Sequence, residues 1–113
     1  MIYTLEQIKE FVEPIAQKYK LKALWVFGSY ARGEATEESD VDFLMDYTDS
    51  IATGFFGFMG LLGEFKQILN KNIDLISTRS LFTSRTENYY LKFMNIVSNE
   101  RVLIYDIERK RNF

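Results

Sequence analysis

Two aspartates and the residue between them form the first pattern in this chain that could do chemistry. Asp40 and Asp42 flank Val41 at the entrance to a stretch that alternates as a strand does. Residues i and i+2 of a strand point to the same side, so the two carboxylates repel each other unless a cation or a proton lies between them. Taken alone, an Asp-x-Asp is more often the solvated end of an edge strand.

A Gly-Ser pair stands where another predicted strand runs into a short helix. Gly28 would let the backbone approach a ligand closely, and the amides that follow, with the Ser29 hydroxyl, could face an anion. On its own, however, such a pair is usually only a turn.

Asp74 adds a third carboxylate, inside an apolar stretch where a buried charge is expensive. A strand end turned to solvent explains it equally well on this evidence.

The three features together favour a functional site, because neighbouring strands would bring three carboxylates close to an anion-binding turn. Hard oxygen ligands around one or two Mg²⁺ ions, beside a phosphate cradle, suit nucleotidyl or phosphoryl transfer. The third carboxylate would then deprotonate or position the acceptor hydroxyl.

The composition of the 113-residue chain is compatible with that chemistry and excludes several others. The chain has no His and no Cys, which excludes Ser-His-Asp and Cys-His catalysis, thiolate nucleophiles and imidazole ligands for zinc. Its formal net charge of −2 disfavours a protein that wraps duplex nucleic acid. The N-terminus lacks a signal-peptide pattern, and the longest apolar run, 51–63, is shorter than the ~20 residues that cross a bilayer. We expect one cytoplasmic domain over residues 1–113, with no membrane or duplex nucleic acid as partner.

Helices and strands must alternate along the chain to position these residues. Thr4 and Gln7 form a capping box that predicts an amphipathic helix over 5–19, bent or broken near Pro14. Ser29 could cap the short helix that follows the first strand. The other elements that we expect are strands over 22–27, 41–47, 72–77 and 102–105, and helices over 54–70 and 84–98. This alternation predicts a small α/β sandwich.

The helix expected over 54–70 has an unusual composition. Gly57, Gly60 and Gly63 recur every third residue, so they would line one narrow face. Each lowers intrinsic helix stability by ~1 kcal/mol relative to Ala. We interpret this face as an internal contact of the helix with the sheet rather than a partner surface, and the Phe residues around it as core.

The run from Phe27 to Leu44 resembles the signature of the DNA-polymerase-β-like nucleotidyltransferases, and in particular the minimal nucleotidyltransferase (MNT) domains. Their pattern is Gly-Ser, ten residues and Asp-x-Asp, matched here by the pairs at 28–29 and 40–42. The family's Ala-Arg-Gly is present at 31–33, and its third carboxylate, in a later strand, matches Asp74. The resemblance covers about residues 5–105.

This resemblance implies a polymerase-β-like nucleotidyltransferase fold, a small mixed sheet flanked by helices. It implies that Gly28 and Ser29 hold the phosphates of a nucleoside triphosphate. It also implies that Asp40 and Asp42 bind two Mg²⁺ ions. Asp74 would contact the catalytic metal and serve as the base or position it. Arg32 would either contact phosphate or form a surface ion pair with a neighbouring glutamate, and both alternatives stay open.

Stand-alone MNT proteins are typically antitoxins paired with a HEPN-domain ribonuclease toxin. The resemblance thus implies a protein adenylyltransferase that moves AMP from ATP to a tyrosine hydroxyl of such a toxin, with which it could form a hetero-oligomer. Two other functions stay open. One is a non-catalytic antitoxin that neutralises its partner by binding alone. The other is nucleotidyl transfer to a small-molecule or tRNA-end hydroxyl.

Overall fold

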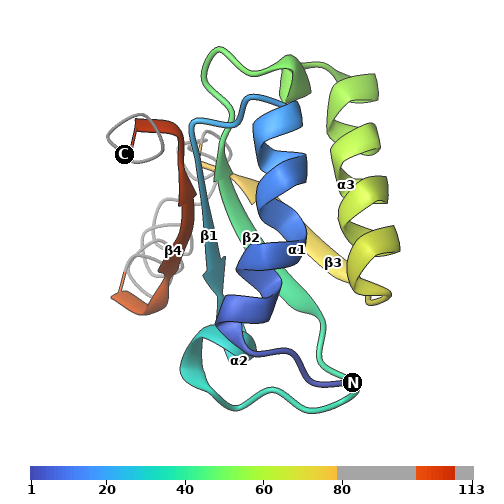
Figure 1. Ribbon diagram of the computed structural model, residues 1–113, viewed down its shortest axis with the longest axis vertical. Coiled ribbons are helices and arrows are strands. Elements are labelled where there is room, and N and C mark those ends of the chain that lie inside the picture. The colour runs from blue at the N-terminus through green and yellow to red at the C-terminus, as the bar shows by residue number, and fades with distance from the viewer. Residues whose placement is uncertain (79–98, 109–113) are drawn as a thin grey trace, which may run out of the picture.

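The computed structural model describes residues 1–78 and 99–108, which form a four-stranded mixed sheet with two long helices on one face (Figure 1). The strands lie in the order β3-β2-β1-β4. β2 pairs antiparallel with β1 and parallel with β3, and β4 pairs antiparallel with β1. The strands are β1 (Ala23–Phe27), β2 (Val41–Asp46), β3 (Ile73–Ser77) and β4 (Val102–Asp106). The expected mixed α/β fold is confirmed, while the helix expected over 84–98 lies outside the described residues.

The first helix, α1 (Leu5–Lys18), begins with the predicted capping box. Thr4 Oγ1 accepts the Gln7 N–H at 3.1 Å, and Gln7 Oε1 accepts the Thr4 N–H at 2.9 Å. A bend or a break near Pro14 was expected; the helix runs through this residue to Lys18, so it is not broken there. Pro14 lies on the exposed side, so the carbonyl that it leaves without an intrahelical donor can reach water. Buried side chains from both halves of α1 hold the helix on the core: Ile8, Val12 and Ala16.

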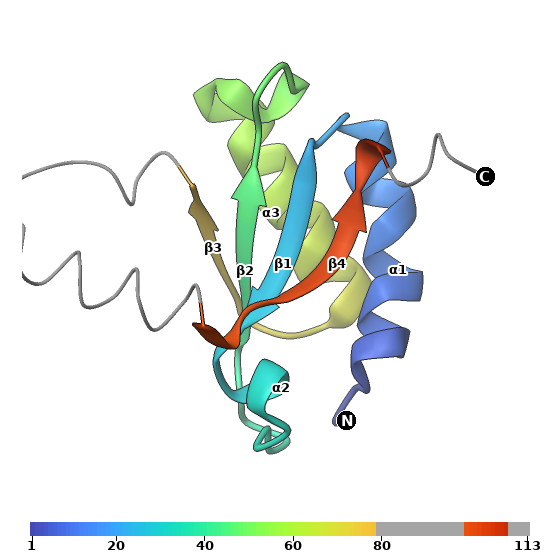
Figure 2. The same ribbon diagram turned by 90° about the vertical axis from the view of Figure 1, so that its left-hand side faces the viewer.

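The central strand β1 carries apolar residues on both faces. Leu24 and Val26 join the core beneath the two long helices, whereas Phe27 packs with Leu44 in a separate cluster. Alternation along β2 places Asp42 on the same side as Leu44, away from α1 and α3. Figure 2 shows the sheet with those helices behind it.

The structure starts one short helix at another position than the sequence indicates, and it adds a 3₁₀ helix ahead of α3. The short helix α2 (Gly28–Arg32) starts at Gly28 itself, because the chain turns there with a φ of 72°, and no side chain caps the helix. The prediction that Ser29 caps it is therefore wrong: Ser29 lies inside the helix. The helix α3 (Phe55–Leu69) follows a 3₁₀ helix, η1 (Ile51–Thr53), that was not expected. No helix within the described ranges is both long and apolar enough to cross a membrane.

The glycine face of α3 makes internal contacts, but these contacts are not with the sheet. A Cβ on Gly57 would overlap the carbonyl oxygen of Ile51 in η1, and one on Gly60 would lie 2.8 Å from the Tyr19 hydroxyl at the end of α1. Gly63 has no neighbour within 4 Å of that position. The first two glycines thus let α3 approach η1 and the end of α1 closely, while the third faces open space.

The phenylalanines of α3 divide between core and surface. Phe65 is fully buried against Phe43 of β2, with ring centroids 5.0 Å apart. Phe55 and Phe56 in the first turn are 72% and 87% exposed, so the expectation that the Phe residues are core is wrong for this pair. Farther along the same helix Leu61 and Leu69 are buried, whereas Met59 and Ile68 are 45% and 42% exposed.

Replacing Gly63 with alanine is expected to raise the free energy of unfolding by about 1 kcal/mol, since the added methyl meets open space and removes backbone freedom from the unfolded chain. The matched Gly57→Ala is expected to lower it by about 2 kcal/mol, because backbone of η1 must move. Urea unfolding of both variants measures the difference. Equal effects at the two positions would contradict the packing described for this face.

Candidate active site

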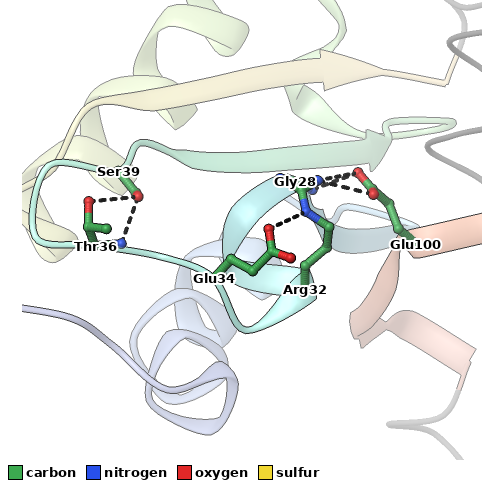
Figure 3. A network of polar contacts seen from close by, with 6 residues as sticks. All are labelled: Gly28, Arg32, Glu34, Thr36, Ser39 and Glu100. Atoms are coloured by element: carbon green, nitrogen blue, oxygen red, sulfur yellow. Dashed lines mark hydrogen bonds and ion pairs between the residues drawn. The ribbon is translucent and has the colours of Figure 1, made fainter.

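The three aspartates singled out by the sequence meet at one end of the sheet. Asp42 lies opposite Phe27 of β1 and directly beside Asp74 of β3 in the parallel register. Asp40 precedes the same strand by one residue, after a turn in which Ser39 Oγ accepts the Thr36 N–H at 2.8 Å (Figure 3). Asp42 is half-buried, while Asp40 and Asp74 are exposed.

The neighbouring carboxylates affect the pKa of Asp42. Burial first, and then the charges of Asp74 and Asp40, together raise the pKa of the Asp42 carboxyl from its ordinary 3.8 to about 6. The Arg32 guanidinium opposes the rise in pKa without cancelling it. A carboxylate in this environment is ionised at neutral pH at a cost, which a bound cation would relieve.

The donor set fits a divalent cation by its chemistry. Carboxylate oxygens are hard ligands of the kind that Mg²⁺ prefers, and the mutual repulsion at Asp42 is what a cation would neutralise. As the side chains lie, the described part of the chain holds no group of three or more acidic residues placed to bind a metal ion together. The expected convergence of the carboxylates is thus present for Asp42 and Asp74, which are paired in the strand register. The three aspartates do not form a preformed set of metal ligands.

Gly28 leaves no room for a side chain beside Asp42. Its φ of 72° lies in the left-handed region, and a Cβ built there would overlap Asp42 Oδ2. The absence of a side chain lets the carboxylate sit against the backbone at the end of β1. The Gly28 N–H donates to Glu100 Oε1 at 3.2 Å, and Ser29 follows it, partly exposed.

Arg32 forms the surface ion pair that was one of its two alternatives. Its Nε lies 3.1 Å from Glu34 Oε2, and its Nη1 lies 3.1 Å from Glu100 Oε2 (Figure 3). Glu34 is the neighbouring glutamate expected from the sequence. A contact of Arg32 with phosphate stays a prediction.

Glu100 is a site residue that sequence reasoning missed. It stands two residues before β4, whose antiparallel register pairs Val102 with Val26 and so brings Glu100 beside Gly28. The strand itself was visible in the sequence, but its pairing partner and register were not. An acidic residue just ahead of a predicted strand was the only available signal.

A pocket of about 520 Å³ adjoins the aspartate end of the sheet. Asp40 lines it together with two cationic side chains from the end of α3 and the turn after it, Lys66 and Lys71. Its size lies in the range of small-molecule sites. Glu37 and Glu38 line it as well, whereas Gly28, Arg32, Asp42 and Asp74 do not, so this pocket lies beside the acidic set and not at the Gly28 turn.

Comparison with known proteins shows the family of the chain. The family model described as "Polymerase beta, Nucleotidyltransferase" matches residues 6–110. A Methanocaldococcus jannaschii protein named "Putative protein adenylyltransferase MJ1379" is 37% identical over 106 residues, which is 90% of this chain and 97% of that protein. Protein adenylyltransferase MntA of Thermococcus cleftensis is 33% identical over 82 residues, 69% of this chain and 81% of the relative.

A solved structure shares the fold at lower sequence identity. It is described as a tri-AMPylated Shewanella oneidensis HEPN toxin in complex with an MNT antitoxin. One of its chains aligns with a TM-score of 0.61 and 15% identity over 96% of this chain and 78% of its own length. The matched family, the relatives and the fold agree: this chain belongs to the polymerase beta family of nucleotidyltransferases.

Proposed function

We propose that this chain is a Mg²⁺-dependent protein adenylyltransferase that acts as an antitoxin, transferring AMP from ATP to a tyrosine hydroxyl of a cognate HEPN ribonuclease toxin. The observation that carries the proposal is the register of Asp42 beside Asp74, next to the backbone of Gly28. The names of the two relatives support AMP as the transferred group. The solved complex of an AMPylated HEPN toxin with an MNT antitoxin supports the class of partner.

In this proposal the anion donors at the end of β1 bind the phosphates. The Gly28 N–H and the Arg32 guanidinium both already contact one anionic group, a carboxylate. Charge-assisted hydrogen bonds from these donors suit phosphate oxygens equally well. Ser29 adds a hydroxyl beside them, and Asp40 and Asp42 hold Mg²⁺. When bound, Mg²⁺ neutralises charge on the triphosphate and on the pyrophosphate that leaves.

The transfer step then needs a nucleophile and a proton acceptor. The tyrosine oxygen forms a bond to the α-phosphorus, the bond from that phosphorus to the bridging oxygen breaks, and pyrophosphate leaves with its electron pair. The proton of the hydroxyl passes to the Asp74 carboxylate, or is held by it for transfer. Asp74 is exposed, so a hydroxyl carried on the surface of another protein can reach it.

The direct test is transfer of label in a purified system. We expect the chain, with Mg²⁺ and ATP labelled at the α-phosphate, to label the HEPN protein encoded beside it, and mass spectrometry to place AMP on a tyrosine. Changing that tyrosine to phenylalanine should remove the label, and ATP labelled at the γ-phosphate should transfer none. Absence of transfer with a folded partner and Mg²⁺ present would contradict the proposal.

A second experiment separates catalysis from neutralisation by binding. Cells that express the toxin are rescued by the wild-type chain, and we expect the double variant Asp40→Ala/Asp42→Ala to fail to rescue them. The matched control, Asp46→Asn, changes an aspartate at the other end of the same strand and should rescue fully. Full rescue by the double variant would show that binding alone neutralises the toxin.

A further inference from the structure

The donors that the proposed function assigns to phosphate are engaged by a carboxylate of the chain itself. The Gly28 N–H donates to Glu100 Oε1 at 3.2 Å, and Arg32 Nη1 lies 3.2 and 3.1 Å from the two oxygens of the same carboxylate (Figure 3). One backbone amide and one guanidinium nitrogen thus hold both oxygens of a single anionic group. Two oxygens of a phosphate could make the same contacts with the same donors.

The sheet places Glu100 there. Because Val26 pairs with Val102 in the antiparallel β1–β4 ladder, the residue two positions before Val102 lies beside the residue two positions after Val26. The next side chain, Arg101, stacks over Trp25 of β1 with its guanidinium carbon 4.6 Å from the ring centroid. Both contacts hold the approach to β4 against the end of β1.

The two glutamates on Arg32 differ in exposure. Glu100 is 21% exposed and Glu34 is 68% exposed. An ion pair surrounded by water contributes little, because solvent screens it and its side chains lose freedom. Glu100 is more sheltered and binds a backbone amide as well, so its carboxylate is the stronger occupant of these donors.

We propose that Glu100 is an internal competitor for the phosphate-binding donors of Gly28 and Arg32, and that a triphosphate must displace its carboxylate to bind there. The inference rests on the proposed function for the identity of the nucleotide, but the competition applies to any phosphate anion. The Gly28 N–H cannot donate to a carboxylate and to a phosphate at the same time. The two anions would also repel each other if both lay beside Gly28 and Arg32. The nucleotide binds only those molecules in which Glu100 has left the donors. The apparent affinity is therefore the intrinsic affinity multiplied by the fraction of molecules with free donors.

The test is anion binding by Glu100→Gln, which keeps the size of the side chain and removes its charge. A neutral amide oxygen is a weaker partner for a guanidinium than a carboxylate is. We expect the variant to bind both inorganic pyrophosphate and Mg²⁺-ATP roughly fivefold more tightly than the wild-type chain in titration calorimetry. Pyrophosphate has no base or ribose and needs no acceptor protein, so it probes the donors alone.

The matched control is Glu34→Gln. This change removes the same charge from the same guanidinium, but Glu34 contacts Arg32 through Nε instead of Nη1. Because the Gly28 amide stays engaged by Glu100, we expect its affinity for pyrophosphate to stay within about twofold of wild type. A gain as large as that of the Glu100 variant would show general charge repulsion and overturn competition for the donors.

The outcomes separate this inference from the proposed function. Tighter pyrophosphate binding by the Glu100 variant supports the competitor role even if no AMP transfer is found. Unchanged or weaker binding, or no binding by either protein, overturns it even if AMP transfer is established. Should that variant fail to fold, the wild-type chain labelled with ¹³C at glutamate carboxylates decides: saturating pyrophosphate must shift the Glu100 resonance, and an unmoved resonance overturns the role.

Discussion

Replacing Asp42 with asparagine is expected to reduce AMP transfer by roughly a thousandfold, since a metal ion held by carboxylates contributes several kcal/mol of transition-state charge stabilisation. Asp42 is the half-buried member of the acidic set and lies beside both Gly28 and Asp74. The measurement is the initial rate of labelled AMP transfer to the HEPN partner under saturating Mg²⁺ and ATP.

The same substitution is expected to leave the domain at least as stable as wild type. Burial and the neighbouring carboxylates raise the pKa of Asp42 to about 6, so its protonated form favours the fold. That stability is present below the ordinary pKa of 3.8 and is lost as the pH rises through about 6. At pH 7 the neutral asparagine should add on the order of 1 kcal/mol after allowance for solvent screening.

Thermal unfolding at several pH values checks this expectation. The wild-type chain, without Mg²⁺, should lose stability between pH 4 and 7 relative to the Asp42→Asn variant.

The control for the transfer rate is Asp46→Asn. This variant keeps an oxygen that can accept from the Thr48 N–H and hydroxyl, as Asp46 Oδ1 does at 3.0 and 2.7 Å. Its transfer rate should stay within about twofold of wild type. Full activity of the Asp42 variant would remove Asp42 from the site.

Replacing Gly28 with alanine is the second change with a large expected effect. The new methyl would occupy the position of Asp42 Oδ2 and would force a side chain onto a φ of 72°. We expect a loss of about 3 kcal/mol in the free energy of unfolding, from backbone strain and from displacement of the carboxylate. Displacing this carboxylate by about 1 Å should also lower transfer by about a hundredfold, because the proposed function gives it a metal-binding role at the reaction centre.

Gly33→Ala is a matched control for that change, because Gly33 has a nearly identical φ of 73° and nothing within 4 Å of a Cβ. Its expected cost is the backbone strain alone, about 1 kcal/mol, with transfer close to wild type. The difference between the two variants in urea unfolding and in rate isolates the contact with Asp42. Equal losses at both positions would mean that this contact is not needed.

Features set by neighbouring residues could be predicted from the sequence. The capping box at Thr4 and Gln7 is present as predicted, because a cap depends on groups three residues apart. The alternation along β2 correctly divided its residues between the two faces of the sheet, since successive side chains of a strand must point to opposite sides. The Gly-Ser/Asp-x-Asp spacing likewise identified the family before any tertiary contact was known.

Features that depend on distant packing could not be predicted. Phe55 and Phe56 are exposed while Phe65 of the same helix is buried, and their shared apolar character gives no hint of this difference. The glycine face of α3 was expected against the sheet, but Gly60 lies against Tyr19. Which surfaces of a helix are covered is decided by elements that are far away in the sequence.

The division is clearest within the site. The sequence by itself predicted which residues would carry the proposed chemistry: the glycine that turns after β1, and the carboxylates at the starts of β2 and β3. Only the tertiary structure decided that Asp42 lies in register with Asp74, and that Glu100 holds the donors of Gly28 and Arg32. Residue types and short spacings are local properties of the chain. Strand order and register instead result from the summed packing of the whole core, so they cannot be predicted from any short segment alone.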